Sequence, residues 1–134
     1  MDDGRYECVL VDRSDDVVTI MMNQPDRRNA LSLTHLRELV DAFRRAGDSD
    51  ARGVILAGNG PVFSAGHDFA DMTGADLAAM RALLTTCAEV MTTMQAIPQP
   101  VVARVHGLAT AAGCQLVATA DLAVAAEVAA AADF

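Results

Sequence analysis

Gln115 and Asp121 are the strongly polar side chains in a stretch of small and apolar residues, GLATAAGCQLVATADLAV at positions 107–124. Small residues allow a peptide group to approach a neighbour or a ligand closely. A second segment, SAGHD at positions 64–68, also follows an apolar run. If both segments lie at the carboxyl ends of parallel strands, two backbone N–H groups could point at one oxygen, as in an oxyanion hole.

The elements that must position these segments are alternating strands and helices. Apolar runs predict strands at 6–11, 17–22, 53–58, 101–107 and 122–126, the first two joined as a hairpin. Ser32 is the expected N-cap of a helix over 33–45, and a third helix is expected to start near Ala111. A helix over 75–96 is expected to bury one stripe, namely Leu77, Met80, Leu84, Cys87, Met91 and Met94. This alternation predicts an α/β fold with a parallel sheet, in a single domain over residues 1–134.

Composition excludes several classes of function. The chain has 134 residues and a net charge of −8, which argues against nucleic acid and an anionic membrane surface as partners. The three cysteines are far apart, so neither a disulfide framework nor a metal site is expected. The start MDDGRYE lacks the features of a signal peptide, and no apolar run is long enough to span a bilayer. A cytoplasmic setting is therefore expected.

Three blocks occur in a specific order: PDRRNALS at 25–32, PVFSAGHDF at 61–69, and IPQPVVARVHGLATAAGCQLVATADLAVA at 97–125. Together they closely resemble the crotonase superfamily of enoyl-CoA hydratases and isomerases, and most of all its enoyl-CoA hydratase domain-containing protein 3 branch. The resemblance implies the ClpP/crotonase fold, a spiral of ββα units. It also implies that residues 1–134 form an incomplete N-terminal domain, without the family's C-terminal helices.

The resemblance implies a coenzyme A thioester as substrate, with no permanently bound cofactor. Its enolate oxygen would accept from the backbone N–H groups of His67 and Ala112. Arg27 and Arg28 either face the coenzyme A phosphates or are simply solvated. The remaining residues expected around the substrate are Ala30, Ala65, Gly66, Asp68, Ala111 and Gly113, with Asp68 fixing its loop rather than carrying a proton.

Histidine side chains offer a second possibility for the chemistry. The ordinary pKa of histidine would let the His67 imidazole act as an acid or base. The resemblance instead implies that the family uses the backbone N–H at this position. His106 is expected to be packed or hydrogen-bonded, and His35, in the first turn of a helix, needs no function.

Gln115 occupies the position of a catalytic glutamate in active hydratases. A glutamine has the same shape but no titratable proton, and acid–base catalysis is worth about 10²–10⁴ in rate. The family's second glutamate has no counterpart, since Glu127 comes too early. Three hypotheses follow: a thioester enzyme of fatty-acid metabolism, an acyl-CoA-binding pseudoenzyme, or a truncated product. An exposed sheet edge also predicts self-association, and the family resemblance implies trimers or hexamers.

Overall fold

Polar residues around Asp15 and Asp16 turn the chain between the first two strands of the main sheet. A computed structural model describes residues 4–129 and 131–132. Five strands form this sheet in the order β1-β2-β3-β4-β6. They are β1 (Val9–Ser14), β2 (Val17–Met22), β3 (Gly53–Gly58), β4 (Val101–Val105) and β6 (Leu122–Ala125). β1 is antiparallel to β2, whereas β2, β3, β4 and β6 are parallel, as the sequence predicted.

Helices connect the parallel strands, and three of them begin where a polar side chain caps them. They are α1 (Leu33–Asp48), α2 (Phe69–Met72), α3 (Leu77–Ala96) and α4 (Ala112–Thr119). The Ser32 side chain accepts from the N–H of His35, as expected of an N-cap, and Asp76 caps α3 in the same way. A 3₁₀ turn, η1 (Pro25–Arg27), follows β2, and β5 (Ala109–Thr110) pairs with β7 (Ala131–Ala132).

The first strand begins three residues later than predicted, because residues 6–8 form hydrogen bonds to side chains of α1. The Tyr6 hydroxyl donates to Asp41 Oδ2 at 2.7 Å, and the N–H of Cys8 donates to Glu38 Oε1 at 2.7 Å. A strand assignment from apolar composition could not anticipate these side-chain acceptors on a helix. β4 ends at Val105 and β6 ends at Ala125, each within two residues of the predicted bound.

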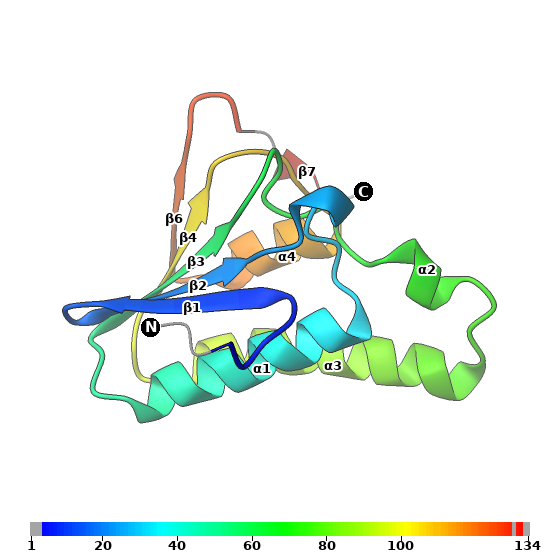
Figure 1. The fold of residues 1–134 in the computed structure, drawn as a ribbon, viewed down its shortest axis with the longest axis horizontal. Coiled ribbons are helices and arrows are strands. Elements are labelled where there is room, and N and C mark those ends of the chain that lie inside the picture. Colours follow the sequence, from blue (N-terminus) through cyan, green and yellow to red (C-terminus); the bar gives the residue numbers. More distant parts are fainter. Residues whose placement is uncertain (1–3, 130, 133–134) are drawn as a thin grey trace.

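The predicted buried stripe of α3 is wrong in part. Leu77 and Leu84 are 68% and 55% exposed. Cys87 and Met94 are buried as predicted, and Met80 and Met91 are partly buried against the core. The helix also buries Leu83, Val90 and Thr93, which were not predicted. Neighbouring apolar pairs at 83–84 and 90–91 allow two rotations of the helix, and packing against α1 selects one of them. Figure 1 shows α3 running beside α1. The first turn of α3, which begins at Leu77, extends beyond the start of α1.

Helices α1 and α3 pack together on one side of the main sheet, and the core lies between these layers (Figure 1). Its fully buried side chains include Ile20, Phe43, Leu56, Met94 and Leu116. No helix of residues 4–129 combines the length and apolar character that a bilayer crossing requires.

β6 lies at the edge of the sheet and pairs only with β4 within the described part of the chain. Its residues are all exposed, with Leu122 and Val124 at 65% and 63%. Unpaired strands with apolar side chains are ready to associate with another chain. Self-association therefore stays a prediction, which light scattering can test.

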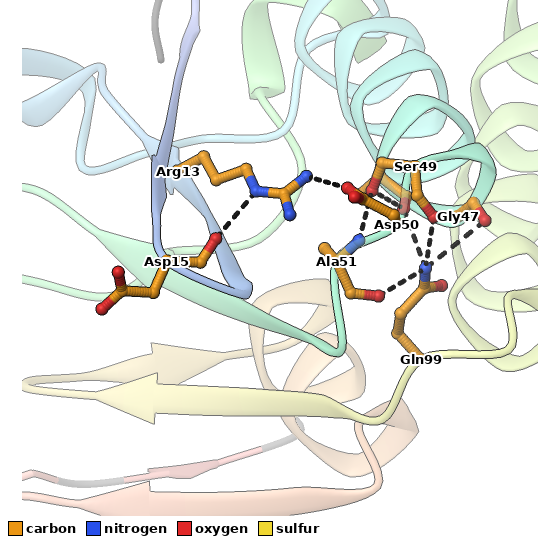
Figure 2. Close-up of polar contacts among 8 residues, drawn as sticks. Arg13, Asp15, Gly47, Ser49, Asp50, Ala51 and Gln99 are labelled. Carbon is orange, nitrogen blue, oxygen red and sulfur yellow. Dashed lines mark hydrogen bonds and ion pairs between the residues drawn. The ribbon is translucent and has the colours of Figure 1, made fainter.

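The buried side chain of Gln99 joins the C-terminal end of α1 to the start of β4. Gln99, just before β4, donates from Nε2 to the carbonyls of Ala46 and Ala51 at 3.1 Å, and more weakly to those of Gly47 and Ser49 at 3.4 Å. Figure 2 shows these carbonyls grouped around the Gln99 amide. Gln99 thereby fixes the end of α1 and the start of β3 relative to β4.

Candidate active site

Three loops meet beyond the carboxyl ends of β2, β3 and β4. They span residues 23–32, 59–68 and 106–111. The ends of parallel strands share one edge of a sheet, and ligands of open α/β folds collect there. The two small-residue segments singled out in the sequence, 64–68 and 107–113, are therefore brought together by strand order.

Asn29 connects the first loop to the second. Its buried side chain donates from Nδ2 to the carbonyls of Asn59 at 2.9 Å and Phe63 at 3.0 Å, and accepts from the N–H of Gln24 at 2.8 Å. Arg28 and Asn29 have φ of 54° and 51°, so the chain makes a tight left-handed bend here. Sequence reasoning did not single out Asn29; the signal available was an asparagine, which tolerates this conformation, inside PDRRNALS.

Ser64 connects the second loop to both others. Its hydroxyl donates to the carbonyl of Asn29 at 2.9 Å and accepts from the N–H of Gly66 at 3.2 Å. Its carbonyl accepts from the N–H of Thr110 at 3.0 Å. Gly113 packs directly on it, since a Cβ at Gly113 would lie 2.8 Å from the Ser64 Cβ. Ser64 is a second positioning residue that sequence reasoning missed.

Gly66 lies against the start of α4. A Cβ at Gly66 would be 3.0 Å from the Ala111 Cβ and 3.3 Å from the Ala112 nitrogen. Its φ of 91° also favours glycine. The residue before His67 and the first N–H of α4 are therefore immediate neighbours.

Hydrogen bonds on either side of His67 determine which way its peptide faces. Leu31 donates to the Gly66 carbonyl at 2.7 Å, and its own carbonyl accepts from the N–H of Asp68 at 3.5 Å. In this parallel bridge the intervening His67 N–H faces away from Leu31. Among residues 4–129 and 131–132, neither the His67 N–H nor the Ala112 N–H has an acceptor. Two neighbouring segments thus each supply one unpaired donor.

Ala111, the residue before α4, has an unusual backbone conformation. Ala112 is an ordinary first residue of α4, whereas Ala111 has φ 50° and ψ −124°. This region is nearly exclusive to glycine and costs about 1–3 kcal/mol for other residues. The bonds from Thr110 N–H to Ser64 and from Gln115 N–H to the Ala111 carbonyl hold it in place.

Gln115 lies one helical turn after Ala111, with its side chain exposed. Its amide has no hydrogen-bond partner among the described residues, and Glu127 is also exposed. In residues 4–129, no three histidine, cysteine or acidic side chains are grouped so that they could hold a metal ion.

Asp68 has the contacts of a loop-fixing residue. Its Oδ1 accepts from the N–H of Ala70 at 2.9 Å and caps α2, and its Oδ2 lies 3.7 Å from Arg27 Nη2. Arg27 and Arg28 are both exposed beside the loop. The Arg28 carbonyl accepts from the N–H of Ala65 at 3.0 Å, so backbone contacts fix the position from which its side chain extends.

The three histidines have different environments. His106 Nε2 is 2.6 Å from the Gly60 carbonyl, as expected for a hydrogen-bonded histidine. His35 is buried, its Nδ1 is 3.0 Å from the Ala30 carbonyl, and burial lowers its pKa. His67 is half-buried, and its Nδ1 has no partner among the described residues.

Two described clefts lie away from this site. They have volumes of about 200 and 530 Å³, and both lie beside the C-terminal end of α1, away from His67 and Ala112.

Comparison with known proteins gives a consistent family. The enoyl-CoA hydratase/isomerase family model matches residues 12–133. Rat enoyl-CoA hydratase domain-containing protein 3, mitochondrial, is 45% identical over 117 residues, covering 86% of this chain and 39% of the rat protein. Mouse Delta(3,5)-Delta(2,4)-dienoyl-CoA isomerase, mitochondrial, is 32% identical over 133 residues, covering 90% of this chain and 41% of the mouse protein.

A solved structure extends this likeness to the fold. Human enoyl-CoA hydratase domain-containing protein 3 superposes with a TM-score of 0.90 and 38% identity, covering 93% of this chain and 50% of the human one. The chain thus spans two fifths to one half of the length of these relatives. Their mitochondrial names do not fit the cytoplasmic setting expected from the sequence. The matching family model and the shared fold, which includes the predicted parallel sheet, place this chain in the enoyl-CoA hydratase/isomerase family.

Proposed function

We propose that the chain binds an acyl-CoA thioester and stabilises negative charge on its carbonyl oxygen with the N–H groups of His67 and Ala112. The observation that carries this proposal is the pair of unpaired backbone donors on adjacent segments. The Ala112 N–H also lies at the start of α4, where the helix dipole adds to the attraction for an anion. Preorganised donors of this kind are each worth about 10²–10³ in rate.

Arg27 and Arg28 are the cations that we assign to the coenzyme A phosphates. Both side chains are exposed on the loop that Asn29 ties to the site. Arg28 is the stronger candidate, because Arg27 already forms an ion pair with Asp68, with 3.7 Å between Nη2 and Oδ2. Ala30, Ala65, Gly66, Ala111 and Gly113 would then provide the close backbone surface along the thioester.

A second function, binding without hydration, is favoured by Gln115. Its amide has no titratable proton and cannot transfer the proton that hydration of an enoyl thioester requires. The chain would then hold an acyl-CoA, or polarise it for a different enolate reaction, without adding water. Both functions require the same two backbone donors.

Amide NMR tests the shared part of the proposal directly. Titration of the ¹⁵N-labelled chain with butyryl-CoA should move the His67 and Ala112 N–H resonances downfield, because each gains an acceptor. Free coenzyme A lacks the thioester oxygen and should leave both resonances in place while still shifting Arg28. The N–H of Leu77, at the equivalent position of α3, is the matched control. Saturable binding that leaves both amides unchanged contradicts the donor assignment.

A hydration assay with crotonyl-CoA on the same sample separates the two functions. Binding without hydration supports the pseudoenzyme, and a gain of hydration in Gln115→Glu would show that the missing carboxylate limits the rate. Hydration by the unmodified chain requires another acid or base. His67→Ala keeps the N–H and removes the imidazole, so loss of turnover in that variant would identify the side chain. Absence of any butyryl-CoA binding contradicts both functions for this chain.

A further inference from the structure

A cleft unrelated to the loop site lies between the β1–β2 hairpin and the C-terminal half of α1. Its volume is about 200 Å³. The apolar lining consists of Val11, Val18, Ala42 and Ala46, and the polar lining of Arg5, Tyr6, Arg13, Arg45 and Ser49. Since α1 begins at the loop site and ends here, the length of α1 separates the two places.

The charged residues that line this cleft are all basic. Three of the ten basic residues line it, although the net charge is −8. No carboxylate is among the described residues that line it. The Tyr6 phenol adds no negative charge, because burial and the hydrogen bond to Asp41 raise its pKa.

Acidic residues outside the lining hold two of the arginines in position. Arg13 Nη1 lies 2.6 Å from Asp50 Oδ1, and Arg13 Nε donates to the carbonyl of Asp15 at 2.9 Å. Figure 2 shows these two contacts, which use Nε and Nη1 of Arg13 and leave its Nη2 for another acceptor. Arg45 Nε is 3.0 Å from Asp41 Oδ2, the same oxygen that binds the Tyr6 hydroxyl.

We propose that this cleft binds a small organic carboxylate. Planar guanidinium groups match the geometry of a carboxylate and bind it with charge-assisted hydrogen bonds. The valines and the Tyr6 ring would cover the apolar part of the ligand. A volume of about 200 Å³ is below the usual range of about 300–1,000 Å³ for drug-sized ligands, so the ligand has a short chain.

The sequence supplies a local probe for this site. Tyr6 is the only tyrosine and there is no tryptophan, so tyrosine fluorescence reports on this cleft alone. Titration with hexanoate should give a saturable change. Hexanol has the same apolar part without the charge, and inorganic phosphate has the charge without the apolar part. Hexanol should bind at least about 10-fold more weakly than hexanoate, since hydrogen bonds to charged groups are worth about that much. Phosphate should also bind at least about 10-fold more weakly, because it buries no apolar surface in the cleft.

Arg13→Gln and Arg45→Gln should each weaken hexanoate about 10-fold or more, whereas Arg81→Gln, on the exposed face of α3, should not. Thermal unfolding of each variant establishes whether it is folded. If Arg45→Gln does not fold, Arg13→Gln alone is sufficient to test the proposal. Any one of three results overturns the proposal: no saturable signal with hexanoate, equal binding of hexanol, or unchanged affinity in Arg13→Gln. Equal affinity for phosphate and hexanoate overturns it in favour of an inorganic anion.

Discussion

The backbone polar groups at the two ends of the parallel strands differ in whether they have hydrogen-bond partners. At the carboxyl ends, the N–H groups of His67 and Ala112 have no acceptor among the described residues. At the amino ends, carbonyls from the end of α1 and the start of β3 are gathered by the single amide of Gln99 (Figure 2). Donors are left over at one end, and at the other the chain supplies its own donor to surplus acceptors.

This difference distinguishes polar groups that hold the fold together from polar groups that are available to a ligand. Buried polar groups are normally paired, because an unpaired group costs about 1–3 kcal/mol. The Nε2 of Gln99 meets that requirement for the carbonyls at the amino ends, although its own Oε1 has no partner among the described residues, and Gln99 thereby fixes α1 on β4. The unpaired N–H groups at the carboxyl ends lie next to each other and are held by the Asn29 and Ser64 contacts. A rigid frame around unpaired donors is what binding of an anionic oxygen requires.

The largest effect is expected from filling the space between the loops of the site. Gly113→Ala places a Cβ against the carbonyl, Cβ and hydroxyl of Ser64, so the 64–68 loop must move. We expect a loss of about 3 kcal/mol in the free energy of unfolding, measured by denaturant titration. Gly53→Ala is the control, because nothing lies within 4 Å of its Cβ. Equal stability of both variants would contradict the tight packing.

Removing the donor at the other end should cost somewhat less. Gln99→Ala leaves the carbonyls of Ala46 and Ala51 without this N–H donor in a buried place, and we expect a loss of about 2 kcal/mol. Gln95→Ala, on the exposed face of α3, should change stability by less than about 0.5 kcal/mol. If the two variants unfold at the same denaturant concentration, Gln99 does not hold α1 on β4.

Acid should weaken the joint between α1 and the first loop. Burial lowers the pKa of His35 below its ordinary value of 6.5, so the unfolded chain takes up a proton before the folded one. The stabilising contribution is therefore complete above about pH 6.5 and declines as the pH falls below it. Unfolding measured between pH 5 and 8 should show this decline. His35→Asn keeps a donor for the Ala30 carbonyl without titrating, and it should remove the His35 part of the slope.

The smallest effects come from a pair of substitutions with opposite sign. Ala111→Gly relieves the positive φ and should stabilise the fold by roughly 0.5–1 kcal/mol, after the entropic cost of glycine. Ala112→Gly, at a helical position, should destabilise by about the same amount. Thermal unfolding of the two variants measures both signs. A destabilised Ala111→Gly would mean that this bend is not strained.

Much of the architecture could be predicted from local patterns. The hairpin, the Ser32 cap and the strand at Gly53–Gly58 follow from turn chemistry and apolar runs, and the structure confirms each of them. The buried side of α3 could not be predicted, because apolar residues at 83–84 and 90–91 fit two rotations. Asn29 and Ser64 were missed for a related reason, since their partners are backbone carbonyls more than 30 residues away.

The sequence alone determined the family, the order of strands and helices, and the absence of a titratable proton at Gln115, because these depend on residue types and short-range spacing. Only the tertiary structure decided which N–H groups stay unpaired, that Ala111 and not Ala112 carries the strained bend, and that three arginines share one cleft. Each of these depends on where distant segments meet. Local sequence does not contain that information, because strand pairing and helix packing select the partners.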